Sequence, residues 1–167
     1  QVAAPLKKEI AFFCTHYHKG INRYRLHFPF QKKYNNSESR KITGEASPYY
    51  LSHPLAPERV RKMLPNVQLI VLLRNPVERA YSSYQNIRKL GLETLSFEEA
   101  ISHEKERIFG EKEKMILDPH YYSSRHQHYS YVERGIYHEE VARWLKHFPR
   151  NQFLFLSSEE FYKNPST

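Results

Sequence analysis

The stretch that decides the fold is LIVLLRNPVERAYSSY, residues 69–84. Its first five residues are all aliphatic, which predicts a buried strand over 69–73. A helix is predicted to begin directly afterwards, because Asn75 is a favourable N-cap residue and Pro76 suits the first helical position. The sequence therefore predicts a strand that ends at Arg74 and turns at once into a helix.

This helix is predicted to have one apolar and one polar face. Residues that recur at helical spacing form the predicted buried face, namely Val77, Ala80, Tyr81, Tyr84 and Ile87. The opposite polar stripe consists of Arg79, Ser82, Ser83 and Asn86. Serine hydroxyls are thus predicted one to two turns beyond the strand end.

A strand–helix unit of this kind is a candidate anion-binding site. Its helix N-terminus would offer free backbone N–H groups and the positive end of the helix dipole. Arg74 would add a fork of guanidinium donors, and the serines would add hydroxyls. The alternative is an ordinary strand–helix unit in which Arg74 pairs with a local carboxylate, and the spacing alone leaves both interpretations open.

Residues 74–84 resemble the 3′-phosphate-binding motif of sulfotransferases that use 3′-phosphoadenosine 5′-phosphosulfate (PAPS). The resemblance implies that Arg74, at the strand end, and Ser82, on the helix, hold the 3′-phosphate of the nucleotide. Arg79 also matches a position of the motif, although it could instead serve a structural ion pair.

The resemblance continues on both sides of this motif. Residues 8–29 resemble the KE-x-x-FF…YHKG-x-x-x-Y…FP stretch of heparan sulfate sulfotransferases, and residues 44–59 and 135–149 match further segments in the family's order. The closest similarity is to the sulfotransferase domain of N-deacetylase/N-sulfotransferases and to related prokaryotic sulfotransferases. It implies an α/β fold, a mostly parallel sheet flanked by helices on both faces, as in P-loop NTPases.

Sulfuryl transfer requires donor and acceptor in line, stabilisation of the moving charge and a base that takes the acceptor's proton. By resemblance, Glu9 occupies the position of the catalytic glutamate. The alternative for Glu9 is a surface glutamate beside Lys7 and Lys8. His18 and Lys19 are candidate contacts to the acceptor or the donor.

The region expected to bind the acceptor contains two tyrosines with alternative interpretations and two departures from the family's pattern. Tyr49 and Tyr50 could line a sugar pocket or simply pack. Ala46 departs from the lysine that heparan sulfate enzymes commonly carry, and Asn86 stands where some relatives carry histidine. These departures weaken a close analogy in the acceptor cleft.

Two nucleotide-binding loops of the family are not found in the sequence. The 5′-phosphosulfate loop would precede Glu9, and the basic loop that closes over the nucleotide would follow Pro165. The five glycines are too widely spaced to form a phosphate-cradling loop elsewhere. We therefore expect a single sulfotransferase-like domain over residues 1–167, truncated at both ends, with half a cofactor site and little or no turnover on its own.

The composition limits the classes of partner. The 167 residues suffice for one domain, and the net charge of +8 implies an anionic partner and disfavours cationic substrates. A single cysteine, Cys14, excludes an internal disulfide and a cysteine metal site. The histidine pairs 16/18 and 126/128 are poor evidence for a metal and are interpreted as solvated loop residues.

The remaining elements follow from periodicity and caps. Further strands are predicted at Glu9–Phe13, 41–46 and 153–156, and a surface loop at 32–40. Further helices are predicted at about 19–27, from Pro57, after the Ser96/Glu99 capping box, along the 137–148 apolar stripe and after Ser157. The helix after Ser96 has a thin apolar stripe and is predicted to be peripheral.

The sequence thus predicts a PAPS-dependent sulfotransferase that needs no metal and acts on a hydroxyl or amine, with a carbohydrate as the expected acceptor. No nucleic acid partner is expected, and no stretch of the sequence has transmembrane length. The compartment would be the cytoplasm if the protein is prokaryotic, with the Golgi lumen as the alternative. A competing hypothesis is a non-catalytic module that binds polyanions through its basic surface. A P-loop kinase relative is disfavoured because no Walker loop is present.

Overall fold

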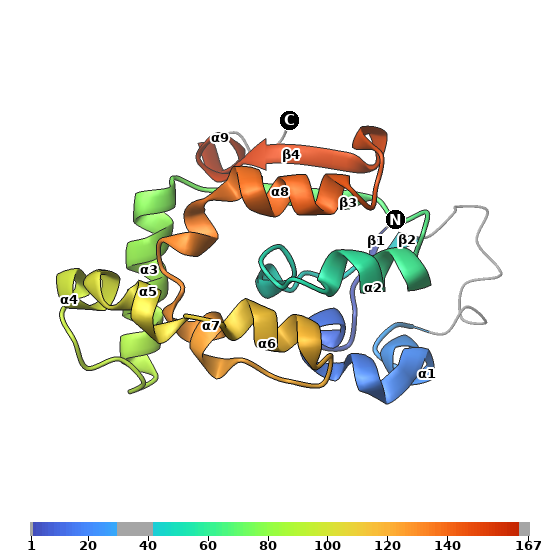
Figure 1. The fold of residues 1–167 in the computed structure, drawn as a ribbon. Helices are drawn as coiled ribbons and strands as arrows, with labels where there is room; N and C mark the ends of the chain where they lie inside the picture. The colour runs from blue at the N-terminus through green and yellow to red at the C-terminus, as the bar shows by residue number, and fades with distance from the viewer. Residues whose placement is uncertain (1, 30–41, 164–167) are drawn as a thin grey trace. The chain divides into compact units, whose positions relative to one another are not determined.

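The computed structural model describes residues 2–29 and 42–163 (Figure 1). The predicted loop at 32–40 lies outside these ranges, as does Lys41 of the predicted 41–46 strand. The chain divides into two compact units, an N-terminal unit, Gln1–Met63, and a C-terminal unit, Leu64–Thr167. Each unit is described by itself below.

The N-terminal unit combines a short parallel strand pair with small helices. Strand β1 (Val2–Ala3) pairs with β2 (Ile42–Thr43), so the second predicted strand is present in shortened form. The helical elements are the π-helix η1 (Phe12–His16), the 3-10 helices η2 (Tyr17–Lys19) and η4 (Pro48–Tyr50), and the α-helices α1 (Gly20–Arg25) and α2 (Ala56–Met63). The helices predicted near residue 19 and from Pro57 are therefore confirmed.

The strand predicted at Glu9–Phe13 is wrong. The neighbouring side chains of Phe12 and Phe13 are both buried, whereas successive residues of a strand point to opposite faces. In the π-helical turn both rings reach one aromatic cluster, and their centroids lie 4.7 and 5.2 Å from that of Tyr24. Packing of two adjacent phenylalanines on the same cluster thus replaces the expected strand.

The C-terminal unit is built on the parallel pair β3 (Leu69–Leu73) and β4 (Phe153–Ser157), in register from Leu69 opposite Phe153 to Leu73 opposite Ser157. Its α-helices are α3 (Pro76–Lys89), α4 (Phe97–Ser102), α5 (Glu104–Arg107), α6 (Glu111–Leu117), α7 (Ser124–Tyr129), α8 (Tyr137–Leu145) and α9 (Ser158–Lys163). The 3-10 helices are η5 (Glu133–Gly135) and η6 (Arg150–Gln152). Strands, helices and parallel pairing agree with the predicted α/β class.

Strand β3 has the predicted bounds but is not buried on both sides. Its residues alternate between half-buried and exposed, and Ile70 is 70% exposed. Figure 1 shows α8 running alongside the strands. The ring of Phe148, which follows α8, lies 6.4 Å from that of Phe153 on β4. A uniformly apolar run carries no alternation, so the sequence could not show which side is covered.

Helix α3 begins as predicted. The side chain of Asn75 accepts hydrogen bonds from the backbone N–H groups of Val77 (3.0 Å) and Glu78 (3.2 Å), which is the geometry of an N-cap. Of the predicted apolar face, Ala80, Tyr84 and Ile87 are buried, whereas Val77 and Tyr81 are exposed. The buried face is therefore narrower than the periodicity suggested.

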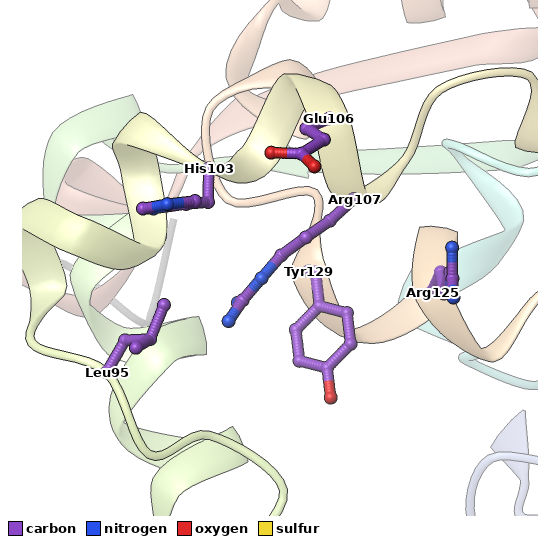
Figure 2. Close-up of a pocket in the computed structure, with 6 residues that line it drawn as sticks. All are labelled: Leu95, His103, Glu106, Arg107, Arg125 and Tyr129. Carbon is purple, nitrogen blue, oxygen red and sulfur yellow. The ribbon is translucent and has the colours of Figure 1, made fainter.

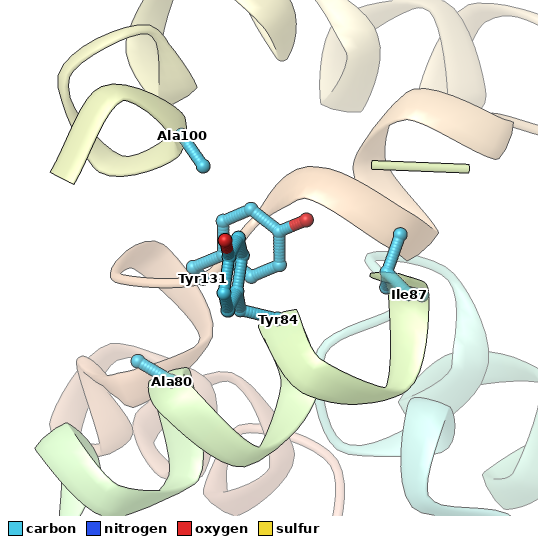
Figure 3. Packing of buried hydrophobic residues seen from close by; sticks show 5 residues of the cluster. All are labelled: Ala80, Tyr84, Ile87, Ala100 and Tyr131. Atoms are coloured by element: carbon cyan, nitrogen blue, oxygen red, sulfur yellow. The ribbon is translucent and has the colours of Figure 1, made fainter. Parts of the chain in front are cut away.

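The buried face of α3 forms the main hydrophobic cluster of the C-terminal unit (Figure 3). The rings of Tyr84 and Tyr131 meet edge to face at 6.1 Å, beside Ala80, Ile87 and Ala100. Ala100 belongs to α4, the helix that opens with the predicted Ser96/Glu99 capping box. Ala100 is fully buried, whereas Glu98, Glu99 and Ser102 of the same helix are exposed, so α4 contributes one small side chain to the cluster and otherwise lies at the surface, as predicted.

Four buried glutamates reinforce the helices of the C-terminal unit. They are Glu93, Glu104, Glu111 and Glu140. Glu93 forms a 2.6 Å ion pair with Arg107 and accepts a hydrogen bond from the hydroxyl of Tyr131. Glu104 accepts the backbone N–H groups of Val132 and Glu133 at 2.7 and 2.8 Å. These carboxylates supply the polar partners that buried backbone and basic groups require.

The buried His126 corrects the prediction that residues 126 and 128 are solvated loop histidines. Both lie in α7, and His126 is almost completely inaccessible to solvent. Burial, with smaller contributions from nearby Lys112 and Arg134, lowers the pKa of His126 to about 3, so its imidazole is neutral at physiological pH.

Within residues 2–29 and 42–163, no helix combines the length and apolar character that crossing a bilayer requires.

Candidate functional site

Arg74 lies at the carboxyl end of β3, and its backbone is fixed on both sides. Its carbonyl oxygen accepts a 2.9 Å hydrogen bond from the hydroxyl of Tyr137. The next backbone N–H, that of Asn75, donates to a carboxylate oxygen of Glu159 at 2.7 Å, and Ser157 donates to the other oxygen at 2.8 Å. Segments that begin α8 and α9 thus hold the turn that carries Arg74.

The guanidinium of Arg74 pairs with a local carboxylate. Its Nε and Nη2 atoms lie 3.3 and 3.1 Å from one oxygen of Glu78, and the two side chains are 44% and 61% exposed. An exposed ion pair at this spacing contributes little free energy to the fold. An anionic ligand can therefore displace Glu78 from the guanidinium of Arg74 or bind to that guanidinium beside Glu78. The local ion pair and the anion site are therefore compatible alternatives rather than exclusive ones.

Ser82 lies one helical turn beyond Glu78 on the same face of α3. Its side chain is exposed, and its hydroxyl makes no hydrogen bond to any other residue of the described chain. The helix periodicity therefore aligns Ser82 with the carboxylate that Arg74 contacts. A guanidinium fork and a free hydroxyl are suitable donors for a phosphate group.

The expected contribution of free backbone N–H groups is wrong. The N–H groups of Val77 and Glu78 donate to the Asn75 side chain, and that of Asn75 donates to Glu159. The hydrogen bond from Asn75 is also the main reason why the pKa of Glu159 falls to about 2, which keeps this carboxylate charged. An anion at this end of α3 would consequently depend on side chains rather than on helix amides.

A surface pocket of about 510 Å³ opens beside Arg74. It is lined by Leu72, Arg74, Glu78, Ser158, Glu159 and Tyr162. The leucine and the tyrosine provide apolar surface, the arginine and the two glutamates provide charges of both signs, and the serine provides a hydroxyl. The pocket thus combines an exposed guanidinium with surface on which a flat, partly apolar group can lie.

Arg79 has a structural role, although not the ion pair considered from the sequence. Its guanidinium donates to the backbone carbonyl of Tyr131, and its Nε atom has no hydrogen-bond partner among the residues that the structure describes. The side chain is half-buried, and this burial lowers its pKa. Arg79 therefore ties α3 to the loop after α7 and is not available to a ligand as Arg74 is.

In the N-terminal unit, Glu9 is exposed and adopts a left-handed backbone conformation, with φ 52°. Lys7 and Lys8 beside it are exposed as well, so its exposure fits the surface-glutamate alternative as much as the catalytic one. The next residue, Ile10, is almost fully buried. Glu9 is thus an unengaged carboxylate, within the described residues, on an otherwise anchored segment.

His18 and Lys19 lie in η2, directly before α1, and both are exposed. The turn is closed by Gly20, whose N–H donates to the carbonyl of Tyr17 and whose φ of 75° suits glycine. The structure therefore presents both predicted contact residues at the surface of the N-terminal unit.

The two tyrosines that could have lined a sugar pocket take part in packing. Tyr49 is buried against the ring of His53, and Tyr50 packs edge to face on Phe13 at 5.5 Å. The Tyr50 hydroxyl donates to Glu45 at 2.7 Å, and burial, followed by the Glu45 charge, raises the pKa of Tyr50. Sequence analysis missed this role of Glu45, because nothing local to it signals a buried phenol partner.

A second pocket, of about 500 Å³, lies between the helices of the C-terminal unit (Figure 2). The guanidinium of Arg107 stacks over the ring of Tyr129 at 4.7 Å and is paired with Glu93, so it serves the local structure. The remaining lining residues are Leu95, His103, Glu106 and Arg125.

Within the described ranges, no group of three or more histidine, cysteine or acidic side chains is placed to hold a metal ion.

Comparisons with known proteins agree with this description. The chain is 29% identical to the nematode (Caenorhabditis elegans) bifunctional heparan sulfate N-deacetylase/N-sulfotransferase 1, over 96% of this chain and 16% of that protein. It is 32% identical to mouse heparan sulfate glucosamine 3-O-sulfotransferase 5, over 95% of this chain and 41% of that protein. It thus spans less than half the length of these relatives.

A solved structure shares the fold. The crystal structure of a sulfotransferase from Alicyclobacillus acidocaldarius matches with a TM-score of 0.66 and 30% identity, over 98% of this chain and 66% of that one. The similarity confirms the predicted sulfotransferase fold. The sequence model of the family described as "Sulfotransferase domain" matches residues 2–167. The chain therefore belongs to the sulfotransferase domain family.

Proposed function

We propose that this protein moves a sulfuryl group from PAPS to a hydroxyl or amine of a carbohydrate acceptor. The observation that carries the proposal is the exposed Arg74 guanidinium at the end of β3, with the unengaged Ser82 hydroxyl on the following helix, in a chain matched by the family over residues 2–167. PAPS would supply the activated sulfuryl group. The residues of this chain would bind and orient the donor and the acceptor, and one of them would take up the proton that the acceptor group loses.

Arg74 and Ser82 are assigned to the 3′-phosphate. A phosphate dianion offers several acceptor oxygens to the fork of guanidinium donors, and it would compete with the single Glu78 oxygen that Arg74 now contacts. Ser82 would donate its hydroxyl. The adenosine would then have the apolar surface of the pocket near Leu72 and Tyr162 beside it.

Glu9 is assigned the role of the base that accepts the proton of the acceptor group. Its carboxylate is exposed and unpaired among the described residues, so a proton can reach it. His18 and Lys19, exposed in the same unit, are assigned contacts to the acceptor or the donor. A carbohydrate acceptor is supported by the heparan sulfate named in the relatives.

Calorimetric titration with adenosine 3′,5′-bisphosphate tests the nucleotide site. We expect binding by the wild type, a loss of at least tenfold in Arg74→Ala and a smaller loss in Ser82→Ala. Arg125→Ala, which removes another exposed arginine of the same unit, is the charge-matched control and should bind normally. Equal binding by Arg74→Ala and the control would refute the assignment.

The net charge of +8 also supports a second candidate, a non-catalytic module that holds polyanions on its basic surface. Heparin binding separates the two functions. A polyanion module would bind heparin equally with and without Arg74→Ala, and adenosine 3′,5′-bisphosphate would have no effect. A sulfotransferase would transfer labelled sulfate from PAPS to the glycan.

A further inference from the structure

The segment that carries Glu9 has an unusual backbone. Glu9 and Ala11 both adopt left-handed conformations, with φ of 52° and 54°, and they are the only such residues other than glycine in the described ranges. Side chains other than glycine disfavour this region, so the surrounding structure must hold them there. Strained residues of this kind cluster at functional sites.

A buried serine holds the second of these residues. The backbone N–H of Ala11 donates a 3.0 Å hydrogen bond to the hydroxyl oxygen of Ser47, which is 8% exposed. The hydroxyl hydrogen of Ser47 points to a carboxylate oxygen of Glu45, 2.9 Å away. Glu45 therefore fixes the direction of the hydroxyl, which leaves the oxygen lone pairs to the Ala11 amide.

Further bonds anchor the residues that follow. The hydroxyl of Tyr50 donates to the other oxygen of Glu45 at 2.7 Å and accepts the N–H of Phe13 at 3.4 Å. Arg59, itself buried, donates to the carbonyl of Phe13 at 2.9 Å. Side chains from residues 45–59 thus hold the backbone at two points after Glu9.

Glu9 directly precedes this anchored segment and is the last of four exposed residues, 6–9. Ile10, Phe12 and Phe13 are each at most 2% exposed, whereas Glu9 is exposed and has no polar partner among the described residues. The local structure therefore fixes the main chain while it leaves the carboxylate to a ligand.

We propose that Ser47, oriented by Glu45, is a positioning residue for Glu9. It holds the Ala11 amide and with it the left-handed turn, so that the Glu9 carboxylate meets the acceptor group in the geometry that proton removal requires. The inference rests on the proposed function, because Ser47 matters for catalysis only if Glu9 is the base. Small displacements of a catalytic group cost up to about 100-fold in rate.

Turnover of the intact protein with PAPS and a heparan-type glycan tests the inference. We expect Ser47→Ala to lower kcat about 10- to 100-fold while the Kd for adenosine 3′,5′-bisphosphate stays unchanged. Ser47→Thr keeps a hydroxyl and should recover most of kcat. Ser52→Ala truncates another buried serine of the same unit and should leave kcat unchanged.

A double-mutant cycle separates positioning from general damage. If Ser47 acts through Glu9, then Ser47→Ala should cause no further loss in kcat once Glu9→Gln is present. Additive losses would overturn the inference. Unchanged kcat in Ser47→Ala would overturn it as well.

The outcomes also separate this inference from the proposed function. Full turnover in Glu9→Gln would refute the assigned base and with it the catalytic importance of Ser47. Hydrogen exchange of the Ala11 amide gives a readout that needs no activity. Exchange should accelerate in Ser47→Ala but not in Ser52→Ala, and unchanged exchange would show that Ser47 does not hold the turn.

Discussion

The hydroxyl of Tyr137, at the first residue of α8, donates a 2.9 Å hydrogen bond to the backbone carbonyl of Arg74, at the end of β3. The two residues are 63 positions apart in the sequence. The bond therefore couples the start of one helix to the turn that presents the candidate phosphate-binding arginine. It fixes the main chain of Arg74 without occupying its guanidinium.

Tyr137→Phe should consequently weaken nucleotide binding more than it weakens the fold. Loss of one hydrogen bond of this kind costs about 1 kcal/mol of folding free energy. The freed turn should lower the affinity for adenosine 3′,5′-bisphosphate several-fold, because Arg74 must then be ordered on binding. Calorimetry and urea unfolding measure the two effects.

Tyr129→Phe is the matched control for this change. The hydroxyl of Tyr129 donates a 2.9 Å hydrogen bond to the carbonyl of Leu92, so the same chemical group is lost at another place in the same unit. The two variants should lose similar stability, and only Tyr137→Phe should lose affinity. A similar loss of affinity in both would attribute the effect to general loosening of the unit.

Glu78→Gln should strengthen nucleotide binding. The Glu78 carboxylate pairs with Arg74 and would repel a phosphate dianion placed at the same guanidinium. Removal of its charge should tighten binding of adenosine 3′,5′-bisphosphate about two- to tenfold at low salt, and the gain should shrink as salt screens the charges. Titrations at two salt concentrations measure this difference.

The control for Glu78→Gln removes one negative charge elsewhere. Glu98 is exposed in the first turn of α4, and Glu98→Gln changes the net charge by the same amount. Its effect on affinity should be small. If Glu78→Gln weakened binding instead, the carboxylate would be a positioning partner of Arg74 rather than a competitor of the phosphate.

The strand–helix unit around Arg74 could be predicted because its signals are local. The aliphatic run, the Asn75 cap and the Pro76 start each act within a few residues, and the structure confirms all three. The turn at Glu9 could not be predicted in this way. Its left-handed backbone depends on Ser47, 36 residues beyond Ala11, and no local pattern contains that partner.

The buried glutamates show the same limit. Glu104 looks like a solvated helix residue, yet it accepts two backbone N–H groups from residues 28 and 29 positions away. Glu93 is likewise joined to Tyr131, 38 positions along the chain. A charged residue is assigned to the surface by composition, and only the tertiary structure reveals its partners.

Glu111 should make stability depend on acid pH. Burial alone would raise its pKa, but hydrogen bonds from Lys114, Ser123 and Tyr121 outweigh burial and lower it to about 2. Because the folded-state pKa lies below that of the unfolded chain, the carboxylate stabilises the fold above about pH 4.5. This contribution, about 3 kcal/mol, is lost as the pH falls towards 2.

Urea unfolding at pH 7, 4 and 3 checks this expectation. Glu111→Gln should be less stable than the wild type at pH 7, and the difference should narrow as the pH falls. Glu113→Gln, an exposed position on the same helix, should follow the wild-type curve throughout. A constant difference between Glu111→Gln and the wild type at every pH would contradict the assigned pKa.

Because Ala11 has a left-handed backbone, its replacement by glycine should not lower stability as the same replacement does in a regular helix. Glycine in a regular helix costs about 1 kcal/mol relative to alanine, because the unfolded chain gains freedom. At a φ of 54° the folded alanine is itself strained by about 1–2 kcal/mol, and glycine removes that strain. Ala11→Gly should therefore leave stability unchanged or raise it by up to about 1 kcal/mol.

Ala142→Gly, at an exposed position within α8, is the matched control and should lose about 1 kcal/mol. Urea unfolding of both variants should then differ by about 1–2 kcal/mol, although the same methyl group has been removed. Equal losses would mean that Ala11 is not held in the left-handed region in solution. Since that turn sets the direction of the Glu9 side chain, the comparison measures the backbone strain on which the positioning role of Ser47 depends.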